Sequence, residues 1–294
     1  MDFHLLKVFF TTANEGSLSK AAQKLNYAQS NVTNKIQQLE ADLQTQLFYR
    51  HNRGITLTPS GMTLVPYAEK ILHSIHEARL AVSNSSVPSG PLTIGSMETT
   101  AAVRLPMLLT RYHEQCPEVD FSLITGPTEQ HLQSVLHYEL NGAFVAGPVE
   151  HPDILQEKVI DEELVIVTPA SHPPIVSISE LNLRTLLVFR SGCSYRAKLQ
   201  QLLHEHGVLP VKMMEFGTLE TIIGCVSAGL GISLLPHSIV AKSEQQGLIR
   251  CHIPEKSLLV TTVFIRRKDA LITTAFEAFL VKMRSYFGEL NTAK

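Results

Sequence analysis

The chain has 294 residues, of which 44% are hydrophobic and 18% are charged, and its formal net charge at pH 7 is −2. This composition excludes disordered and fibrous proteins, and the length predicts two or three domains. The charge excludes a protein that coats nucleic acid with its whole surface, but it allows a small local DNA-binding face. The sequence has no run of about 18 uninterrupted apolar residues, and its start, MDFHLLKVFF, has no basic region followed by a small-residue cleavage site. We therefore expect a cytoplasmic protein with no membrane partner.

Sequence motifs of catalysis and metal binding are absent. The four cysteines show no CxxC pair and no His/Cys metal spacing. The sequence also has no G-x-S-x-G, H-E-x-x-H, G-x-x-x-x-G-K-[ST] or G-x-G-x-x-G motif. We predict a protein that is not an enzyme, with free thiols in a reducing compartment and with no catalytic residue, metal or cofactor.

The first 58 residues predict three helices and a hairpin. The first helix is expected to end near Gly16, and Ser17 is expected to cap the second. The third lies within AQSNVTNKIQQLE (28–40), where apolar residues follow helix spacing but short polar side chains crowd the first turns. The segment LFYRHNRGITLTPSG (47–61) predicts a hairpin with residues 50–54 at its tip.

The charges of this unit indicate what its third helix contacts. No acidic residue lies between Glu15 and Glu40, and the hairpin is basic. Helix, turn, helix and basic hairpin is the order of a winged helix-turn-helix, whose second motif helix enters the major groove of DNA. Such positions need side chains that donate and accept hydrogen bonds at bases and phosphates. The predicted DNA-binding residues are Ser17, Gln29, Ser30, Thr33, Asn34 and Lys35 on the helices, and Arg50 and Arg53 on the wing.

A long helix is expected to begin at Pro59. Its apolar residues recur every three or four positions in a narrow seam, which is typical of a coiled coil. The alternative, a helix packed on a globular core, normally shows a wider apolar stripe. The segment SNSSVPSGP (83–91) predicts a hinge. We predict that two copies of the chain pair through Leu64, Ala68, Ile71, Ile75, Ala78 and Val82.

From residue 88 onward, short apolar runs alternate with helical patterns, which predicts a parallel α/β sheet in two lobes. Lobe I is expected at about 88–160 and 266–294, and lobe II at about 161–265. The predicted strands are 92–96, 120–125, 142–147, 163–168, 185–190, 231–235 and 258–265, and the predicted helices are 101–115, 128–139, 194–206, 219–228 and 270–286.

Four predicted strand-to-helix turns carry hydroxyl groups or glycines. In an open parallel sheet, ligands settle beyond the carboxyl ends of the strands, where helix N-termini offer free N–H groups. The alternative is that these hydroxyls only cap their own helices. We predict a cleft for a small anion, with Arg196 as its charge partner, formed by Ser96, Thr99, Thr100, Thr125, Ser194, Arg196 and Thr218.

Cys193 falls in the same region. It lies near a predicted helix start and close in sequence to Arg190 and Arg196. These surroundings are expected to lower the pKa of its thiol, which makes redox sensing an alternative to packing or ligand contact.

The run GSLSKAAQKLNYAQSNVTNKIQQLEADLQTQLFYRHNRGITLTPSG (16–61) resembles the DNA-binding region of LysR-type transcriptional regulators. It carries the patterns GS-x-x-x-AA-x-x-L, Q-S-x-V-(S/T)-x-x-I-x-x-LE and LF-x-R-x-x-R-x-x-x-LT-x-x-G, and GPLTIG and VSAGLGISLLP extend the resemblance over the whole chain. The resemblance implies a winged helix-turn-helix domain at 1–58, a linker helix and hinge at 59–87, and an α/β effector domain at 88–294. The effector domain is expected to have two lobes and the shape of a type 2 periplasmic binding protein.

The same resemblance implies the partners of the chain. They are double-stranded DNA with an interrupted palindrome near a promoter, a small-molecule effector, and further copies in a homodimer or tetramer, with RNA polymerase as a further candidate. Position 34 is often basic in this family and is Asn here, so Arg50 and Arg53 are expected to supply most phosphate contacts.

The sequence therefore predicts a sequence-specific transcriptional regulator controlled by an effector, with closure of the two lobes changing the spacing of the DNA-binding heads. The alternatives are a redox-responsive regulator acting through Cys193 and a ligand-binding protein without a DNA function.

Overall fold

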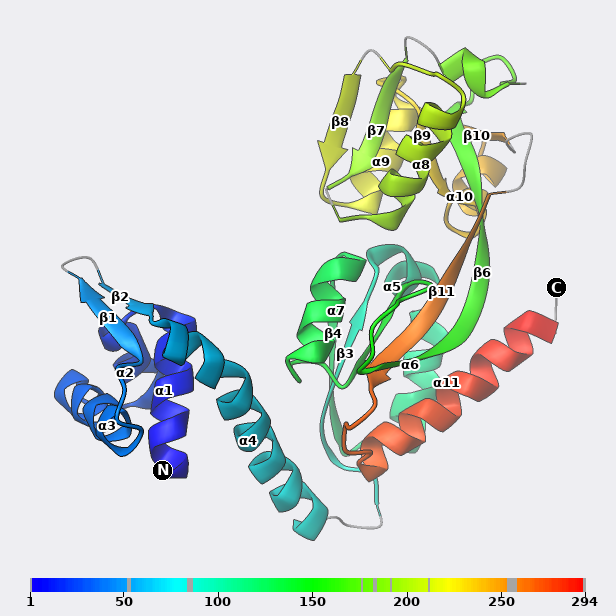
Figure 1. The fold of residues 1–294 in the computed structure, drawn as a ribbon. Helices are drawn as coiled ribbons and strands as arrows, with labels where there is room; N and C mark the ends of the chain where they lie inside the picture. The colour runs from blue at the N-terminus through cyan, green and yellow to red at the C-terminus, as the bar shows by residue number, and fades with distance from the viewer. Residues whose placement is uncertain are drawn as a thin grey trace. The chain divides into compact units, whose positions relative to one another are not determined.

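The computed structural model describes residues 2–51, 54–83, 87–175, 177–181, 184–190, 192–210, 212–252 and 258–292. The chain divides into two compact units, Met1–Asn84 and Ser85–Lys294, each of which is described by itself (Figure 1). No helix in the described ranges combines the length and the hydropathy needed to cross a membrane.

The N-terminal unit is built from helices packed around one apolar core, with a hairpin beside them (Figure 1). The Ser17 hydroxyl accepts the Lys20 N–H at 3.4 Å and caps the second helix, as its position in the sequence predicts. The apolar stripe of the third helix, Val32, Ile36 and Leu39, is fully buried. The elements are α1 (Phe3–Glu15), α2 (Leu18–Leu25), α3 (Gln29–Asp42), β1 (Phe48–His51), β2 (Gly54–Leu57) and α4 (Pro59–Ser83).

One carboxylate connects the hairpin to α3. Glu40 accepts hydrogen bonds from the backbone N–H groups of Leu47 at 2.8 Å and Phe48 at 3.3 Å. Arg50, on β1, lies 3.7 Å from the second oxygen of the same side chain. Because these contacts join the last turns of α3 to the first residues of the hairpin, they fix the wing relative to the helix.

Helix α4 docks on this unit with part of the predicted pairing seam. Ala68 is fully buried in the core of the N-terminal unit, and Leu64 and Ile71 pack against that core. The expectation that Ala68 joins two copies is therefore wrong, because its side chain is enclosed within its own chain. Ile75 is half-buried, whereas Ala78 and Val82 are exposed, so pairing through the later turns of α4 stays a prediction.

The C-terminal unit contains a seven-stranded sheet with the strand order β10-β6-β11-β5-β3-β4, in which β9 also pairs with β6, and a separate two-stranded sheet of β7 and β8. Helices cover both sheets (Figure 1). The strands are β3 (Gly90–Ser96), β4 (Val119–Thr125), β5 (Gly142–Ala146), β6 (Ile154–Pro169), β7 (Thr185–Phe189), β8 (Lys212–Phe216), β9 (Ser233–Pro236), β10 (Ile249–His252) and β11 (Leu258–Arg267). The helices are α5 (Glu98–Val103), α6 (Leu105–Gln115), α7 (Thr128–Leu136), the 3-10 helix η1 (Ile178–Leu181), α8 (Ser194–Glu205), α9 (Leu219–Ser227), α10 (His237–Gln245) and α11 (Thr274–Thr292).

The large sheet is mixed, whereas the sequence predicted a parallel one. Strands β3, β4 and β5 are parallel neighbours, but β6 and β11 pair antiparallel over the whole length of β11, with a register shift between Thr262 and Val263. The first half of β6 was missed because exposed Leu155 follows buried Ile154 and polar residues such as Gln156 and Lys158 come next, so the segment shows no apolar alternation. The prediction of one helix at 101–115 also missed the break at Arg104 between α5 and α6.

Each lobe of this unit has its own core. In lobe I, aromatic rings pack edge to face or tilted, as in the Phe144–Phe264 pair at 4.9 Å and the Tyr112–Phe279 pair at 5.4 Å between ring centroids. The core of lobe II is aliphatic and is formed by β6, β7, β9 and the helices beside them. Since β6 and β11 contribute to both cores, the two lobes are joined by these two strands (Figure 1).

Gly61 gives a test of the packing between α4 and the hairpin. A Cβ at this position would overlap the Leu47 carbonyl oxygen, which belongs to the rigid start of the hairpin. We expect Gly61→Ala to lower the free energy of unfolding of the N-terminal unit by about 2 kcal/mol, measured by thermal or urea unfolding followed by circular dichroism.

The matched control is Gly288→Ala in α11, where an added Cβ meets no atom within 4 Å. This change should be neutral or slightly stabilising, because alanine favours the helix. Equal behaviour of the two variants would contradict the close approach at Gly61.

Candidate DNA-binding face and ligand cavity

Helix α3 presents an uncharged polar surface at its N-terminal end. Gln29, Ser30 and Asn34 are exposed, on the side opposite the buried apolar stripe. Ala28 occupies the N-cap position and has no side-chain acceptor, so no side chain of the cap residue competes with a phosphate oxygen for the first N–H groups of the helix. This end of α3 therefore offers both side-chain and backbone hydrogen-bonding groups to a large ligand.

The other predicted DNA-binding residues also make contacts within the unit. The Thr33 hydroxyl donates to the Gln29 carbonyl at 3.0 Å, and the Lys35 ammonium lies 6.0 Å from the centroid of the Tyr27 ring. The Ser17 hydroxyl serves as the cap of α2, and exposed Arg50 lies near Glu40 as described above. Arg53 lies outside the described residues.

A cavity of about 380 Å³ opens between the lobes of the C-terminal unit. Its walls are the carboxyl ends of β4 and β7, the first turns of α5, α7 and α8, and the turn after β8. Helices α7 and α8 direct the free N–H groups of their first turns toward this region. The cavity lies at the edge of the strands where an open α/β sheet binds ligands.

Only some of the predicted effector-binding residues line this cavity. Thr99, Thr125 and Ser194 do. Ser96 is fully buried and its hydroxyl donates to the Met97 carbonyl at 2.9 Å, and Thr100 is buried as well. These two hydroxyls belong to the interior of lobe I rather than to the ligand site.

Two further predicted residues have structural contacts in lobe II. Arg196 donates to Glu215 at 2.6 Å and to the Phe189 carbonyl at 3.3 Å, so it is engaged within the lobe. Thr218 caps α9 by accepting the Thr221 N–H at 3.3 Å. Neither residue lines the cavity. Thr218 instead caps its own helix, which is the alternative given for these hydroxyls in the sequence analysis.

Five polar residues of the lining were not predicted from the sequence: Glu98, Thr128, Gln130, Arg190 and Tyr195. Arg190 directly follows β7, so its place at a strand end was the signal that could have found it. Its side chain makes no ion pair with any residue in the described ranges, unlike Arg196. Arg190 is therefore the cation that the cavity offers to a ligand.

Hydrogen bonds between the lobes hold the walls of the cavity together. The hydroxyls of Thr99 and Tyr195 are 3.0 Å apart, and the Leu219 N–H donates to Glu98 at 3.0 Å. Burial raises the pKa of Tyr195, so its phenol stays protonated at neutral pH.

Behind the cavity, Arg104 forms a bidentate pair with Glu162 at 2.8 and 3.0 Å, and the Ser238 hydroxyl donates to the same carboxylate at 2.8 Å. This pair is largely buried, and removing one partner of such a pair costs about 3–5 kcal/mol. It joins the α5–α6 junction of lobe I to β6 and α10.

Cys193 does not have the activated thiol that the sequence suggested. Burial raises the pKa of this thiol, and this effect outweighs the nearby backbone N–H groups and Arg196, which lower it. All four cysteines of the chain are free. The expectation of a lowered pKa is wrong, and the redox alternative loses its chemical basis.

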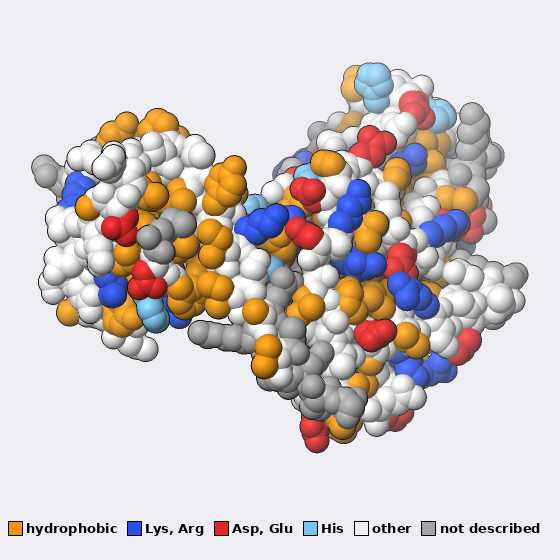
Figure 2. Space-filling model, turned by 60° about the horizontal axis from the view of Figure 1, so that its bottom comes forward, with side chains coloured by type: hydrophobic (Ala, Val, Ile, Leu, Met, Phe, Trp, Pro, Cys, Tyr) orange, Lys and Arg blue, Asp and Glu red, His pale blue; other side chains and the backbone are white. Residues whose placement is uncertain are grey.

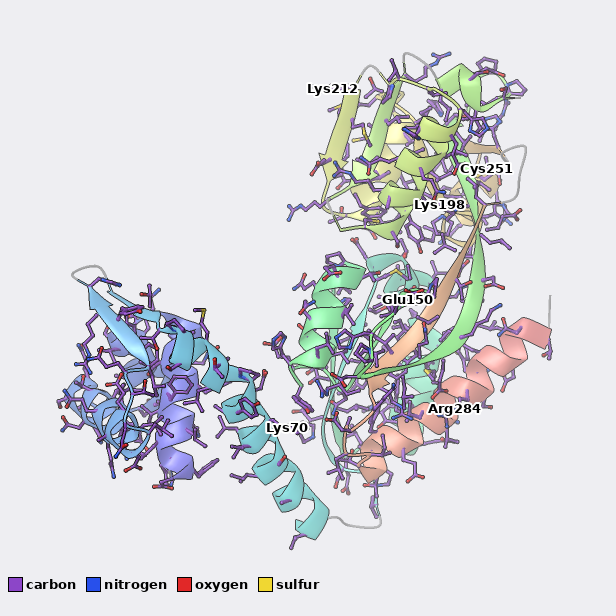
Figure 3. The ribbon with its side chains drawn as sticks, in the orientation of Figure 1. Lys70, Glu150, Lys198, Lys212, Cys251 and Arg284 are labelled. Atoms are coloured by element: carbon purple, nitrogen blue, oxygen red, sulfur yellow. The ribbon has the colours of Figure 1, made fainter. Side chains whose placement is uncertain are left out.

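A cluster of His237, Glu244 and Cys251 comes together in lobe II, and Figure 3 labels Cys251 there. The His237 ring nitrogen lies 3.4 Å from Glu244, and the Cys251 N–H donates to Glu244 at 2.9 Å. Burial, followed by the adjacent Glu244, raises the pKa of the Cys251 thiol to about 12. These three side chains therefore satisfy one another, and we assign them no metal.

The surface charges of the C-terminal unit are mixed. On the face shown in Figure 2, basic and acidic side chains are interspersed over this unit. Several of them form ion pairs, such as Arg284 with Glu157 at 2.6 Å and Arg111 with Glu289 at 2.9 Å. Such mixed surfaces do not concentrate the positive potential that attracts nucleic acid.

Comparison with known proteins assigns both units. A family model described as the LysR substrate binding domain matches residues 85–287, and one described as the bacterial regulatory helix-turn-helix protein, lysR family, matches residues 3–62. The HTH-type transcriptional regulator GltR of Bacillus subtilis (strain 168) is 68% identical over 288 residues, which are 98% of this chain and 97% of that protein.

Solved structures share the fold. A full-length OxyR variant from Pseudomonas aeruginosa superposes with a TM-score of 0.71 at 24% identity, covering 97% of this chain and 95% of that one. Full-length CbnR, solved with its target DNA, superposes with a TM-score of 0.65 at 23% identity, covering 97% of this chain and 100% of that one. The fold of this chain is thus shared with these two proteins over nearly its whole length.

The raised pKa of Cys193 predicts slow chemistry at this thiol. At pH 7.5 the half-buried thiol is expected to stay protonated, so iodoacetamide should modify Cys193 more slowly in the folded protein than in the same protein unfolded in guanidinium chloride. Peptide mass spectrometry over a time course measures both rates. Faster modification of Cys193 in the folded state would restore the redox alternative.

Proposed function

The chain belongs to the LysR family of DNA-binding transcriptional regulators and carries the ligand-binding domain of that family, and from this premise we propose how it recognises DNA and what controls it. Residues 1–58 read a specific DNA sequence through α3 and the wing. Residues 59–87 link the two parts and pair two copies through the later turns of α4. Residues 88–294 bind a small anionic effector between their lobes.

The exposed start of α3 carries the proposal for DNA. Gln29, Ser30 and Asn34 stand on a helix that the core holds by three fully buried apolar residues, so their positions are fixed before DNA arrives. Glutamine and asparagine amides pair with adenine in the major groove, and serine hydroxyls pair with several bases. The Glu40 contacts hold the basic wing beside this helix, where Arg50 and Arg53 meet phosphates.

The cavity lining supports an anionic effector. The guanidinium of Arg190 offers five N–H donors, and Thr99, Thr125 and Ser194 add hydroxyl groups. The first turns of α7 and α8 add the partial positive charge of helix N-termini. A carboxylate fits this set of donors better than a neutral ligand does.

Control follows from the joining of the lobes. A ligand that contacts both walls favours one closure of the lobes, and in a dimer or tetramer this closure changes the spacing of the DNA-binding heads. Coupling of this kind is typically worth about 1–3 kcal/mol, which is about 5–150-fold in DNA affinity. The proposed setting is the cytoplasm, near a promoter and within reach of RNA polymerase.

A gel-shift experiment tests the DNA proposal. Full-length protein is mixed with labelled DNA from the region flanking its gene, in the presence of excess unrelated competitor DNA. Retention of the flanking DNA alone supports sequence-specific regulation. Equal competition by unrelated DNA at moderate salt would leave a nonspecific binder, and no retention at all would contradict DNA binding at this site.

Two substitutions separate base reading from phosphate contact. Gln29→Ala should relax discrimination at particular base pairs, by about 1–3 kcal/mol at each. Arg50→Ala should weaken binding to all sequences and reduce the slope of log K against log salt by about 1. Titrations against operator variants at several salt concentrations measure both effects. Identical behaviour of the two variants across all operators would contradict this division of roles.

The ligand site is tested by Arg190→Gln. The loss of the guanidinium should abolish or strongly weaken the effector response of the protein without changing its DNA affinity in the absence of effector. Lys212→Gln is the charge-matched control, because Lys212 is an exposed cation of lobe II on β8 outside the cavity lining (Figure 3). An unchanged response in Arg190→Gln would place the effector elsewhere.

A further inference from the structure

We infer that the effector carries a positive charge as well as a negative one, and that it is a small amino acid bound with its carboxylate at Arg190 and its ammonium at Glu98. This inference rests on the proposed ligand site. Glu98 begins α5 in lobe I and Arg190 follows β7 in lobe II, and both side chains line the cavity. The two charges therefore face one ligand from opposite lobes.

The charges of the lining favour an effector that carries a positive group in addition to the carboxylate proposed above. Glu98 and Arg190 are the charged residues among those that line the cavity, so its charged lining is balanced rather than basic. A ligand with only negative charge would gain attraction from Arg190 and suffer repulsion from Glu98. Both side chains are attracted to the ligand only if it is a zwitterion. Its ammonium then faces the Glu98 carboxylate, and its carboxylate faces the Arg190 guanidinium.

A single short turn places the two charges relative to each other. The Arg190 guanidinium packs against Gly217, where an added Cβ would lie 3.3 Å from a guanidinium nitrogen. The Glu98 carboxylate accepts the N–H of Leu219, two residues further along the same turn, at 3.0 Å. Two residues of chain span at most about 7 Å, so the two contacts that hold these charged groups lie close together on one turn.

The two charged ends of an α-amino acid suit two opposite charges that are held on one turn. The ammonium and carboxylate of such a ligand are two bonds apart, and a charge-assisted hydrogen bond of about 2.8 Å at each end gives a reach of about 8 Å. Within the described ranges, Glu98 and Arg190 make no ion pair with each other, although they contact neighbouring residues of one turn. A bound amino acid pairs its ammonium with Glu98 and its carboxylate with Arg190, which form no ion pair with each other.

Both groups keep free hydrogen-bonding capacity. A carboxylate has two oxygens with about four acceptor sites, and the Leu219 N–H occupies one oxygen of Glu98. A guanidinium has five N–H donors, and none of those on Arg190 is used by a residue in the described part of the chain. The hydrogen bond between Glu98 and Leu219 joins the two lobes, and it leaves the second carboxylate oxygen of Glu98 available to a ligand.

The rest of the lining fits the remaining parts of such a ligand. Thr99 and Ser194 add hydroxyl groups to the lining, and Met97, Phe189 and Phe216 supply apolar surface for a side chain. A cavity of about 380 Å³ is large enough for a ligand of this size. An amino acid held in this way contacts both lobes at once, which is what favours their closure.

The test uses full-length protein and isothermal titration calorimetry. The probes are the twenty standard L-amino acids and, for the one that binds most tightly, its 2-hydroxy acid, which lacks the ammonium, and its amide, which lacks the carboxylate. The variants are Glu98→Gln, which keeps an oxygen to accept the Leu219 N–H, and Arg190→Gln. Glu220→Gln on the exposed surface of α9 and Lys212→Gln are the matched controls.

At least one amino acid should bind the wild type, with its 2-hydroxy acid and its amide weaker by about tenfold or more. Glu98→Gln should weaken the amino acid by about tenfold or more and leave the 2-hydroxy acid unchanged, whereas Arg190→Gln should weaken both. Both control variants should bind as the wild type does.

Equal binding of the amino acid and the 2-hydroxy acid, or unchanged binding in Glu98→Gln, would overturn the inference. If Arg190→Gln still weakens the 2-hydroxy acid, the proposed anion site stands without the zwitterion. If no amino acid binds, the inference is wrong. If 2-hydroxy acids and dicarboxylic acids also fail to bind, the proposed ligand site is wrong as well.

Discussion

Two long strands, β6 and β11, pass through both lobes of the C-terminal unit and pair antiparallel over the whole length of β11. Their lobe II ends, including Leu164 and Val260, belong to the aliphatic core, and their lobe I ends, including Ile160 and Phe264, belong to the aromatic core. The two cores are connected through these strands, and the cavity lies at the junction of the two lobes. The cavity walls are the turns that these two cores position.

The contacts across that junction explain how a ligand would be sensed. The Arg104–Glu162 pair and the Thr99–Tyr195 hydrogen bond fix the lobes at points around the cavity, while Glu98 reaches from one lobe to the other at its edge. Binding there changes contacts that already join the lobes, so a small ligand acts on their closure. In the N-terminal unit, Glu40 has a comparable role, because the hydrogen bonds that it accepts from the start of the hairpin fix the wing to α3.

Local features could be predicted from the sequence, and contacts between distant segments could not. The Ser17 cap and the buried stripe of α3 follow from spacing within one helix. Ser96 and Thr99 both lie near a strand end, but only the folded turn decides that Thr99 faces the cavity and Ser96 the core. Ala68 was assigned to pairing because a coiled-coil seam and a core-facing stripe share the same spacing. The contact that Glu98 makes across the cavity could not be predicted, because its hydrogen-bond partner, Leu219, is more than a hundred residues away in the sequence.

In the proposed coupling, ligand in the cavity of the C-terminal unit changes the DNA affinity of the N-terminal unit. Fluorescence anisotropy of a labelled operator, titrated with full-length protein with and without a saturating amino acid ligand, measures that coupling directly. We expect the DNA dissociation constant to change by about 5–150-fold in the wild type and to stay unchanged in Arg190→Gln. Equal affinities with and without ligand in a wild-type protein that binds both would contradict this coupling.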